Sequence, residues 1–134
     1  MEYPISQLNS AQFPPLLREI PDPPKQLYLR GTLPSFDLRW LTVVGSRKYT
    51  SYGKSACEHL VHGLRGAPVV IVSGLALGID AIAHKTALDT GLPCVAIPGS
   101  GLDWKELYPQ SNHALARAIL ESGGALLSEY EPLQ

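Results

Sequence analysis

Charged side chains are scarce in this 134-residue sequence, and neither sign of charge dominates. Eleven Lys and Arg residues are balanced by twelve Asp and Glu residues, which gives a net charge of −1 at pH 7. This balance excludes a protein that coats nucleic acid through a broadly basic surface. Any binding of nucleic acid therefore has to use a local pocket of hydrogen-bond donors and a few cations.

Long apolar runs are also absent, and the first residues, MEYPISQLNS, lack the basic and apolar regions of a signal peptide. We therefore expect a cytoplasmic protein with no membrane partner. Only two cysteines are present, Cys57 in a predicted helix and Cys94 in a predicted buried strand. We expect both to be reduced packing residues, and neither has the neighbours that a zinc site requires.

Proline divides the chain into two regions. Six of the twelve prolines lie within residues 1–26. Because proline lacks an N–H group, this stretch is not a central strand or a long helix. We predict a proline-rich N-terminal arm over residues 1–39 that wraps over the rest of the chain, with a short helix near residues 9–20 as the alternative. A short strand is predicted from Gln26 to Arg30.

From residue 40 onward, apolar strands alternate with helices. The predicted strands cover residues 41–45, 69–73, 93–99 and 124–129, and the predicted helices cover residues 54–65, 79–90 and 111–122. In the first helix the predicted buried residues are Ala56, Leu60, Val61 and Leu64. The alternation is typical of an α/β fold, and we predict a Rossmann-like, doubly wound parallel sheet over residues 40–134. We expect strand order 3-2-1-4, with a ligand site at the switch point between the first and fourth strands.

Three of these strands run directly into glycine-rich loops, at residues 45–53, 73–80 and 98–103. Glycine lets the backbone approach a ligand, and the N-terminus of the following helix offers free N–H groups that suit phosphate. The predicted phosphate-binding residues are Gly45, Ser46, Arg47, Lys48, Thr50, Gly53, Ser73, Gly74, Leu75, Ala76, Gly78, Asp80, His84, Gly99, Ser100 and Gly101.

Arg47 is the first candidate phosphate ligand, because a guanidinium group can bind two phosphate oxygens at once. Lys48 is either a second ligand or a solvated surface cation. Asp80 and His84 lie four residues apart on one predicted helix. They either form the floor of the pocket or act as a capping carboxylate and a structural histidine, and we favour the structural interpretation.

Catalytic and cofactor motifs are missing from the same loops. Neither Ser73 nor Ser100 lies in a G-x-S-x-G elbow, and the G-x-G-x-x-G and Walker patterns are absent. We therefore predict no enzyme activity and no cofactor. Trp104 is the better candidate for stacking on a base, whereas Tyr108-Pro109 is expected to close the end of the core.

Four segments, VVGSRKYTSYG, SGLALGIDAIAH, IPGSGLDWKELYPQSN and ESGGALLSEY, resemble the DprA/Smf family (DNA-processing protein A) in order and spacing. The resemblance covers about residues 20–130. It implies a Rossmann-like protein that binds single-stranded DNA during DNA processing, recombination and natural transformation, and that helps to load RecA. It also implies that the motif contacting the DNA backbone falls on Gly45, Ser46 and Arg47.

The family's domain continues beyond the fourth strand, with segments that contribute to dimerisation and to the RecA contact. We therefore expect the fourth strand to be a sheet edge that either pairs with a second copy of the chain, giving a homo-oligomer, or is covered by the proline-rich arm. Two other functions stay open. One is a sensor module that binds a free nucleotide, and the other is a phosphoribohydrolase-like enzyme that uses Glu106 and the loop at residues 98–101.

Overall fold

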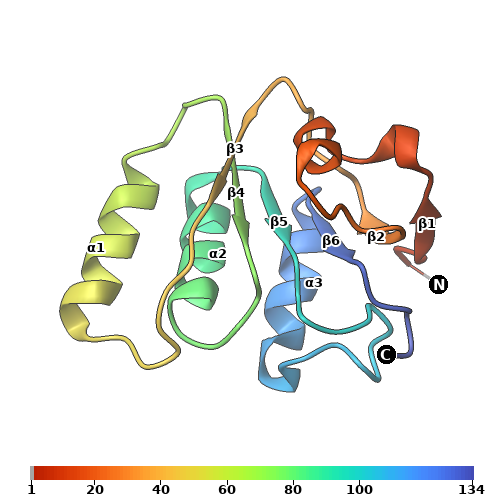
Figure 1. Ribbon diagram of the computed structural model, residues 1–134. Helices are drawn as coiled ribbons and strands as arrows, with labels where there is room; N and C mark the ends of the chain where they lie inside the picture. Colours follow the sequence, from red (N-terminus) through yellow and green to blue (C-terminus); the bar gives the residue numbers. More distant parts are fainter. Residues whose placement is uncertain (1) are drawn as a thin grey trace.

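A computed structural model describes residues 2–134 and contains one six-stranded mixed sheet in the order β1-β2-β6-β5-β4-β3 (Figure 1). The strands are β1 (Ser6–Leu8), β2 (Leu27–Gly31), β3 (Arg39–Thr42), β4 (Val69–Ser73), β5 (Cys94–Ala96) and β6 (Ala125–Ser128). Strands β3, β4, β5 and β6 are parallel to one another, whereas β2 is antiparallel to both β6 and β1. The sheet is therefore a parallel unit extended on one side by the N-terminal arm.

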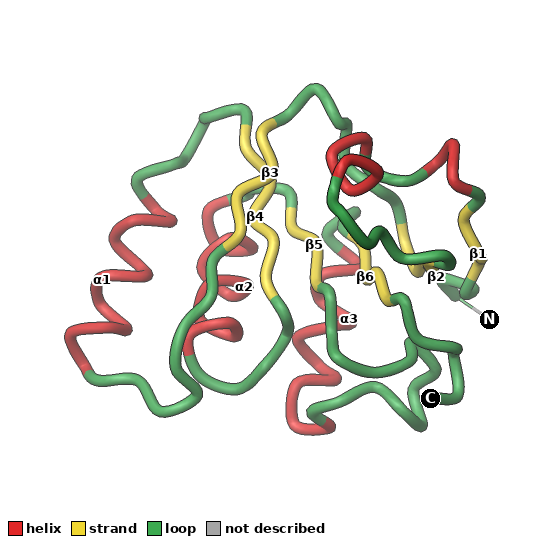
Figure 2. Tube along the Cα trace, viewed as in Figure 1, coloured by secondary structure: helices red, strands yellow, loops and turns green. Residues whose placement is uncertain are grey.

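Helices connect the parallel strands, as Figure 2 shows. The α-helices are α1 (Ser51–His62), α2 (Ile79–Thr90) and α3 (His113–Glu121), and the 3₁₀-helices are η1 (Ser10–Gln12), η2 (Pro15–Glu19) and η3 (Gln110–Asn112). The bounds of α2 and β4 are those predicted from the sequence. The N-terminal arm forms two 3₁₀-helices where a short helix was the alternative prediction. No helix within residues 2–134 has the length and apolar character needed to span a bilayer.

The predicted α/β class, with parallel strands joined by helices, is confirmed, but the strand order 3-2-1-4 is wrong. Strands β3, β4, β5 and β6 lie side by side in the order of the chain. Each right-handed crossover therefore advances in the same direction, and α1, α2 and α3 lie on one face of the sheet. The expected switch point and second helical layer do not form, although the loops that follow β3, β4 and β5 still meet at one edge.

Of the two alternatives for the fourth strand, coverage by the N-terminal arm is the one that the structure shows. Strand β6 is paired on both sides, with β5 and with β2, so it offers no free edge to a second copy. The free edge is β3, where Leu41 and Val44 are exposed although the sequence predicts a buried strand. An apolar run alone does not tell whether a strand has neighbours on both sides.

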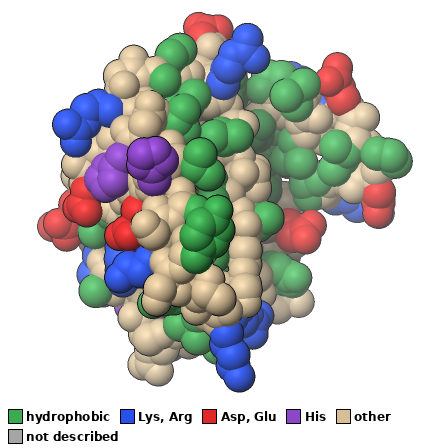
Figure 3. Space-filling model, turned by 90° about the vertical axis from the view of Figure 1, so that its left-hand side faces the viewer, with side chains coloured by type: hydrophobic (Ala, Val, Ile, Leu, Met, Phe, Trp, Pro, Cys, Tyr) green, Lys and Arg blue, Asp and Glu red, His purple; other side chains and the backbone are tan. Residues whose placement is uncertain are grey.

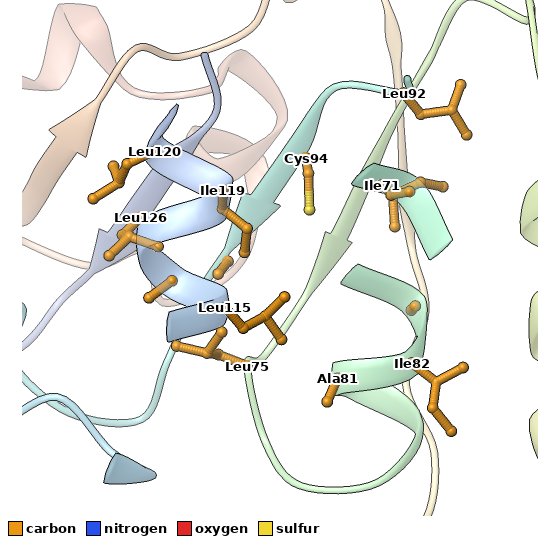
Figure 4. Close-up of a cluster of buried hydrophobic side chains, with 14 of the residues drawn as sticks. Ile71, Leu75, Ala81, Ile82, Leu92, Cys94, Leu115, Ile119, Leu120 and Leu126 are labelled. Atoms are coloured by element: carbon orange, nitrogen blue, oxygen red, sulfur yellow. The ribbon is translucent and has the colours of Figure 1, made fainter. Parts of the chain in front are cut away.

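The core has two layers, one on each face of the sheet. On the helical face, Ile71 and Cys94 pack with residues of α2 and α3 such as Ile119 (Figure 4). On the other face, Val70 and Val72 pack with side chains of the N-terminal arm, including Leu8 and Phe13. The predicted wrapping of the arm is therefore confirmed, and its strand β2 enters the sheet. The division of the chain at residue 40 stays a prediction.

The buried face of α1 is offset from the predicted one. Leu60 is 69% exposed, whereas Cys57 and Val61 are buried. These two positions lie four residues apart on one side of the helix, and Leu60 lies on another side. Both cysteines are free and buried, as predicted. Burial raises the pKa of the Cys94 thiol to about 12, so this side chain stays protonated at neutral pH.

The arm packing predicts the effect of shortening Phe13, which is 4% exposed against the sheet. Phe13→Ala is expected to lower the free energy of unfolding by about 3 kcal/mol, because it leaves a cavity between arm and sheet. Leu16→Ala is the matched control, since Leu16 is 77% exposed, and a change within about 0.5 kcal/mol is expected there. Urea titration measures the unfolding free energy of both variants. Equal losses would show that packing of Phe13 against the sheet does not stabilise the fold.

Candidate functional site

The loops that follow β3, β4 and β5 meet at the lower end of the sheet in Figure 1 and enclose a pocket of about 270 Å³. Each loop contributes to its wall. The lining residues are Arg47 from the first loop, Gly74, Ala76 and Leu77 from the second, and Gly99, Tyr108 and Pro109 from the third. Four of the predicted binding residues therefore meet here, namely Arg47, Gly74, Ala76 and Gly99.

The first and second loops are in direct backbone contact at Gly78. A Cβ atom at this position would overlap the carbonyl oxygen of Ser46 and lie 2.6 Å from Arg47 Cα. Gly78 also has φ +84°, a conformation that side chains disfavour. The next residue, Ile79, donates its N–H to the carbonyl oxygen of Ser46 at 3.1 Å. Gly78 therefore sets the position of the loop that carries Arg47.

The second loop contains a non-glycine residue with positive φ. Leu75 has φ +63° and a fully buried side chain. Three polar side chains hold this turn. Asp80 Oδ2 accepts from the Gly74 N–H at 3.0 Å, His84 Nε2 accepts from the Leu75 N–H at 3.3 Å, and Asn112 Nδ2 donates to the Leu75 carbonyl oxygen at 2.8 Å. A strained backbone held from both sides is typical of a preorganised site.

His84 is fully buried between this turn and β5. Its Nδ1 lies 2.9 Å from Cys94 Sγ. Desolvation lowers the pKa of His84 to about 4, opposed by the charge of Asp80, so the imidazole is neutral at pH 7. Asp80 and His84 thus bond to the loop backbone, which agrees with a structural role for both, but Asp80 does not cap α2 as the favoured interpretation predicts.

In the third loop, the hydroxyl group of Ser100 points into the protein. Ser100 is buried, and its Oγ accepts from the Tyr108 N–H at 3.0 Å. A Cβ atom on Gly101 would overlap the backbone of Glu131 and Pro132. Ser100 and Gly101 therefore fix the path of the loop against the C-terminal segment, and they do not line the pocket.

Hydroxyl groups of the other predicted residues are likewise used inside the loops. Ser46 Oγ donates to the Lys48 carbonyl oxygen and accepts from the Lys48 N–H. Ser73 Oγ donates to the carbonyl oxygen of Val43. Thr50 Oγ1 caps α1 by accepting from the Gly53 N–H at 3.0 Å. These groups shape the loops, whereas Lys48 is exposed and is not among the residues that line the pocket.

Gly45 has a packing role in the first loop. A Cβ atom at this position would lie 2.7 Å from Ile79 Cβ, so the glycine lets the loop pass over the start of α2.

Figure 3 shows acidic and basic side chains interspersed over the α1 side of the molecule, with Lys and Arg side chains at its lower end, where these loops lie. Within residues 2–134, no three His, Cys, Asp or Glu side chains are grouped to hold a metal ion.

The two aromatic residues of the third loop, Trp104 and Tyr108, differ in exposure. Trp104 is partly buried, with the guanidinium carbon of Arg30 4.8 Å and that of Arg117 4.1 Å from its ring centroid. Its ring therefore already contacts two guanidinium groups, and base stacking by Trp104 stays a prediction. Tyr108 is 61% exposed and lines the pocket, so the prediction that it closes the core is wrong.

Sequence reasoning missed four residues of this region. Leu77, Tyr108 and Pro109 line the pocket, and Arg30 is buried beneath Trp104. The position of Tyr108 in a loop at the carboxyl edge, next to proline, was a usable signal for exposure. Arg30 gave no signal, because an arginine in a short strand of the arm is ordinarily exposed.

Residues 5–134 match the model of the family described as DNA recombination-mediator protein A. The chain belongs to this family. It is 38% identical over 122 residues to Protein Smf of Escherichia coli K12, and 37% identical over 131 residues to DNA processing protein DprA of Streptococcus pneumoniae R6. These matches cover 91% and 98% of the chain, but only 32% and 45% of those relatives.

Two solved structures of the family share the fold. DNA processing protein A of Helicobacter pylori, which binds single-stranded DNA, gives a TM-score of 0.79 at 32% identity, over 96% of this chain and 57% of that one. DprA of Streptococcus pneumoniae gives 0.78 at 34% identity, over 98% of this chain and 47% of that one. The predicted family and Rossmann-like fold are confirmed, for a chain about half as long as its structural neighbours.

The contact at Gly78 predicts a large effect of one methyl group. Gly78→Ala is expected to lower the free energy of unfolding by about 2–5 kcal/mol, the sum of backbone strain and overlap with the first loop. Gly66→Ala separates the two causes, because Gly66 has φ +80° but nothing within 4 Å of a Cβ atom. Its expected cost is about 1–2 kcal/mol. Equal losses in thermal or urea unfolding would contradict the interlocking of the loops.

The buried His84 predicts a pH dependence of stability. Its pKa is about 4 in the folded chain and 6.5 as the reference value. Between these values the unfolded chain binds a proton that the folded chain excludes, so stability falls as pH is lowered from 6.5 toward 4. His84→Gln removes this contribution, and its unfolding free energy should depend less on pH than that of wild type between pH 7 and 5. Parallel curves for the two proteins would refute a buried neutral His84.

Proposed function

We propose that this chain binds single-stranded DNA at the pocket formed by its three glycine-rich loops. The observation that carries the proposal is the position of Arg47, an exposed guanidinium group on the wall of a pocket otherwise lined by glycine, small and apolar residues. Such a cation suits the backbone phosphate, which is the same at every nucleotide. The single-strand binding of the Helicobacter pylori protein, which shares the fold, supports this assignment.

The charge of the chain fits a local contact. With a net charge of −1, the chain gains little from long-range attraction to DNA. Affinity then depends on groups that lie close to the phosphate, and Arg47 and Lys48 are the cations of the first loop. We propose that Ser46, Ser73, Ser100, Asp80, His84 and most glycines act indirectly, by holding these loops in place.

The wider role also follows from the family. We propose that the whole protein acts in DNA processing during natural transformation, in the cytoplasm, and that it binds DNA without catalysing a reaction. Contact with RecA and self-association are further proposals for the whole protein, since the chain covers 32–45% of the two relatives described above. The enzyme alternative gains no support, because Glu106 is not among the residues that line the pocket.

Binding of a fluorescent single-stranded oligonucleotide tests the proposal directly. Anisotropy is measured for single-stranded and duplex DNA of the same sequence as salt is raised. Preferential binding of the single strand that weakens with salt is expected. A free nucleoside monophosphate, added as competitor, should displace the strand only at high concentration. Displacement at concentrations near the affinity of the strand would favour the nucleotide sensor instead.

Arg47→Ala is expected to weaken single-strand binding about tenfold or more, because a charge-assisted hydrogen bond to phosphate is lost. The slope of log affinity against log salt should fall by about 0.7 for one lost phosphate contact. Arg47→Lys keeps the charge and should retain the slope, with part of the affinity lost.

Arg65→Ala is the matched control for charge. Arg65 is exposed, follows α1 and lies before β4, at the end of the sheet away from the pocket. Arg65→Ala removes the same charge from the chain as Arg47→Ala, and it should leave the affinity for single-stranded DNA and the salt slope unchanged. If Arg47→Ala and Arg65→Ala behave alike, the phosphate role of Arg47 is wrong.

A further inference from the structure

Trp104 connects the third loop to two other parts of the fold. The guanidinium carbon of Arg30, in β2, lies 4.8 Å from its ring centroid, and that of Arg117, in α3, lies 4.1 Å from it. Arg30 is 1% exposed, and a cation–π contact is stronger when the cation is withdrawn from water. The ring therefore holds the third loop between the N-terminal arm and α3.

Arg30 also attracts the residue that precedes Trp104. Desolvation lowers the pKa of the Arg30 guanidinium group, and the negative charge of Asp103 opposes this shift. Asp103 Oδ1 accepts from the Lys105 N–H at 3.0 Å, which fixes the turn that carries Trp104. Two adjacent residues of the third loop, Asp103 and Trp104, are therefore attached to the arm.

The C-terminal segment connects the same two regions. Tyr28, which like Arg30 belongs to β2, donates from its hydroxyl group to Glu131 Oε2 at 2.7 Å. The Asp103 N–H donates to the carbonyl oxygen of the next residue, Pro132, at 3.1 Å. Strand β2 therefore holds the third loop both directly and through the C-terminal segment.

On its other side, Trp104 lies against a residue that holds the pocket wall. The ring centroids of Trp104 and His113 are 5.6 Å apart, and His113 Nε2 lies 2.6 Å from the carbonyl oxygen of Leu107. The next two residues, Tyr108 and Pro109, line the pocket, whereas Trp104 does not. A path of contacts thus runs from the arm through Trp104 to the wall of the pocket.

We propose that Trp104 is a positioning residue, which makes the affinity of the pocket for single-stranded DNA depend on docking of the N-terminal arm. Trp104 acts through the third loop and not through contact with a nucleotide. The inference rests on the proposed function and extends it from the pocket to the arm. Coupling between two sites is reciprocal, so bound DNA stabilises the docked arm by the same factor.

Trp40 provides a matched control for the removal of an indole. It is partly buried in β3 and donates from Nε1 to the carbonyl oxygen of Ser35 at 3.2 Å. Its ring lies against that of Phe36, with centroids 5.5 Å apart. These contacts do not involve the third loop, so truncation of Trp40 should cost stability without altering the pocket.

Trp104→Ala is expected to weaken binding of a single-stranded oligonucleotide about tenfold, within the usual range of coupling between sites. The salt slope should stay at the wild-type value, because no phosphate contact is lost. Trp104→Phe keeps an aromatic face for the two guanidinium groups and should restore most of the affinity. Trp40→Ala should bind like wild type. Equal losses in Trp104→Ala and Trp40→Ala would overturn the positioning role.

Arg30→Met tests the arm side of the contact, and it does so even where Trp104→Ala fails to fold. It removes the cation from β2 but keeps an apolar side chain, and it should weaken single-strand binding with an unchanged salt slope. Combined with Trp104→Ala it should add no further loss, because both changes remove one contact. Wild-type affinity in Arg30→Met, or additive losses in the double variant, would show that the arm does not act through Trp104.

An oligonucleotide with abasic sugars separates positioning from direct stacking of Trp104 on a base, since it offers no base to stack. If Trp104 positions the loop, Trp104→Ala weakens binding of the abasic strand and of the normal strand by the same factor. If the variant binds the abasic strand like wild type, Trp104 contacts a base and the positioning role is wrong.

Hydrogen exchange tests the reciprocal effect in the unaltered protein. Saturating oligonucleotide should slow exchange of the β2 amides, residues Leu27–Gly31, about tenfold in wild type and by a smaller factor in Trp104→Ala. Unchanged exchange of these amides in wild type would show that the arm and the pocket are independent.

The outcomes also separate this inference from the proposed function. If Arg47→Ala lowers the salt slope while Trp104→Ala and Arg30→Met bind like wild type, coupling to the arm is wrong and the phosphate site stands. If Arg47→Ala leaves affinity and slope unchanged, the pocket is not the DNA site, and the role of Trp104 fails with it.

Discussion

Gly78 has no side chain at the point where the first and second loops meet, and its backbone lies directly against that of Ser46 and Arg47. This close contact fixes the exposed arginine relative to the turn at Gly74–Ala76. The hydrogen bond from the Ile79 N–H to the Ser46 carbonyl oxygen also holds the first loop against the start of α2. Since α2 begins at Ile79, the pocket wall is attached to a helix that is buried along most of its length. The site is thus held by a rigid element although its surface consists of loops.

Most polar groups near the pocket face into the protein. Asp80, His84 and Asn112 bond to the backbone of the second loop, and Ser100 bonds to that of the third. Their hydrogen-bonding capacity is used to fix backbone conformations that include a left-handed leucine at position 75. Few side chains remain to contact a ligand. This arrangement suits a ligand with one repeating charged group, and it is compatible with the proposal that a nearly neutral chain binds phosphate at this pocket.

Local pattern predicted the regular elements well and their arrangement less well. The bounds of α2 and β4 follow from apolar periodicity and from the glycine that ends α2. The strand order was wrong because handedness fixes how a crossover turns but not beside which strand it returns. Exposure of Leu41 and Leu60 depends on neighbours that periodicity does not contain. For the site, loop composition identified Arg47, Gly74, Ala76 and Gly99, whereas the exposure of Tyr108 depends on Ser100 and Ser128 from distant positions.

The pairing of β2 with β6 has a consequence for how the chain assembles. Parallel strands β3 to β6 join neighbours that follow one another in sequence, whereas the arm reaches across to the last strand, as in the bond from Tyr28 to Glu131 over 103 positions. During synthesis on the ribosome, β2 emerges before the four parallel strands, and its partner β6 is the last of these four to emerge. The pairing of β2 with β6 therefore forms only after β6 has been translated, although Leu8 and Phe13 also pack against β4, so insertion of β2 into the sheet is a late, long-range closure step.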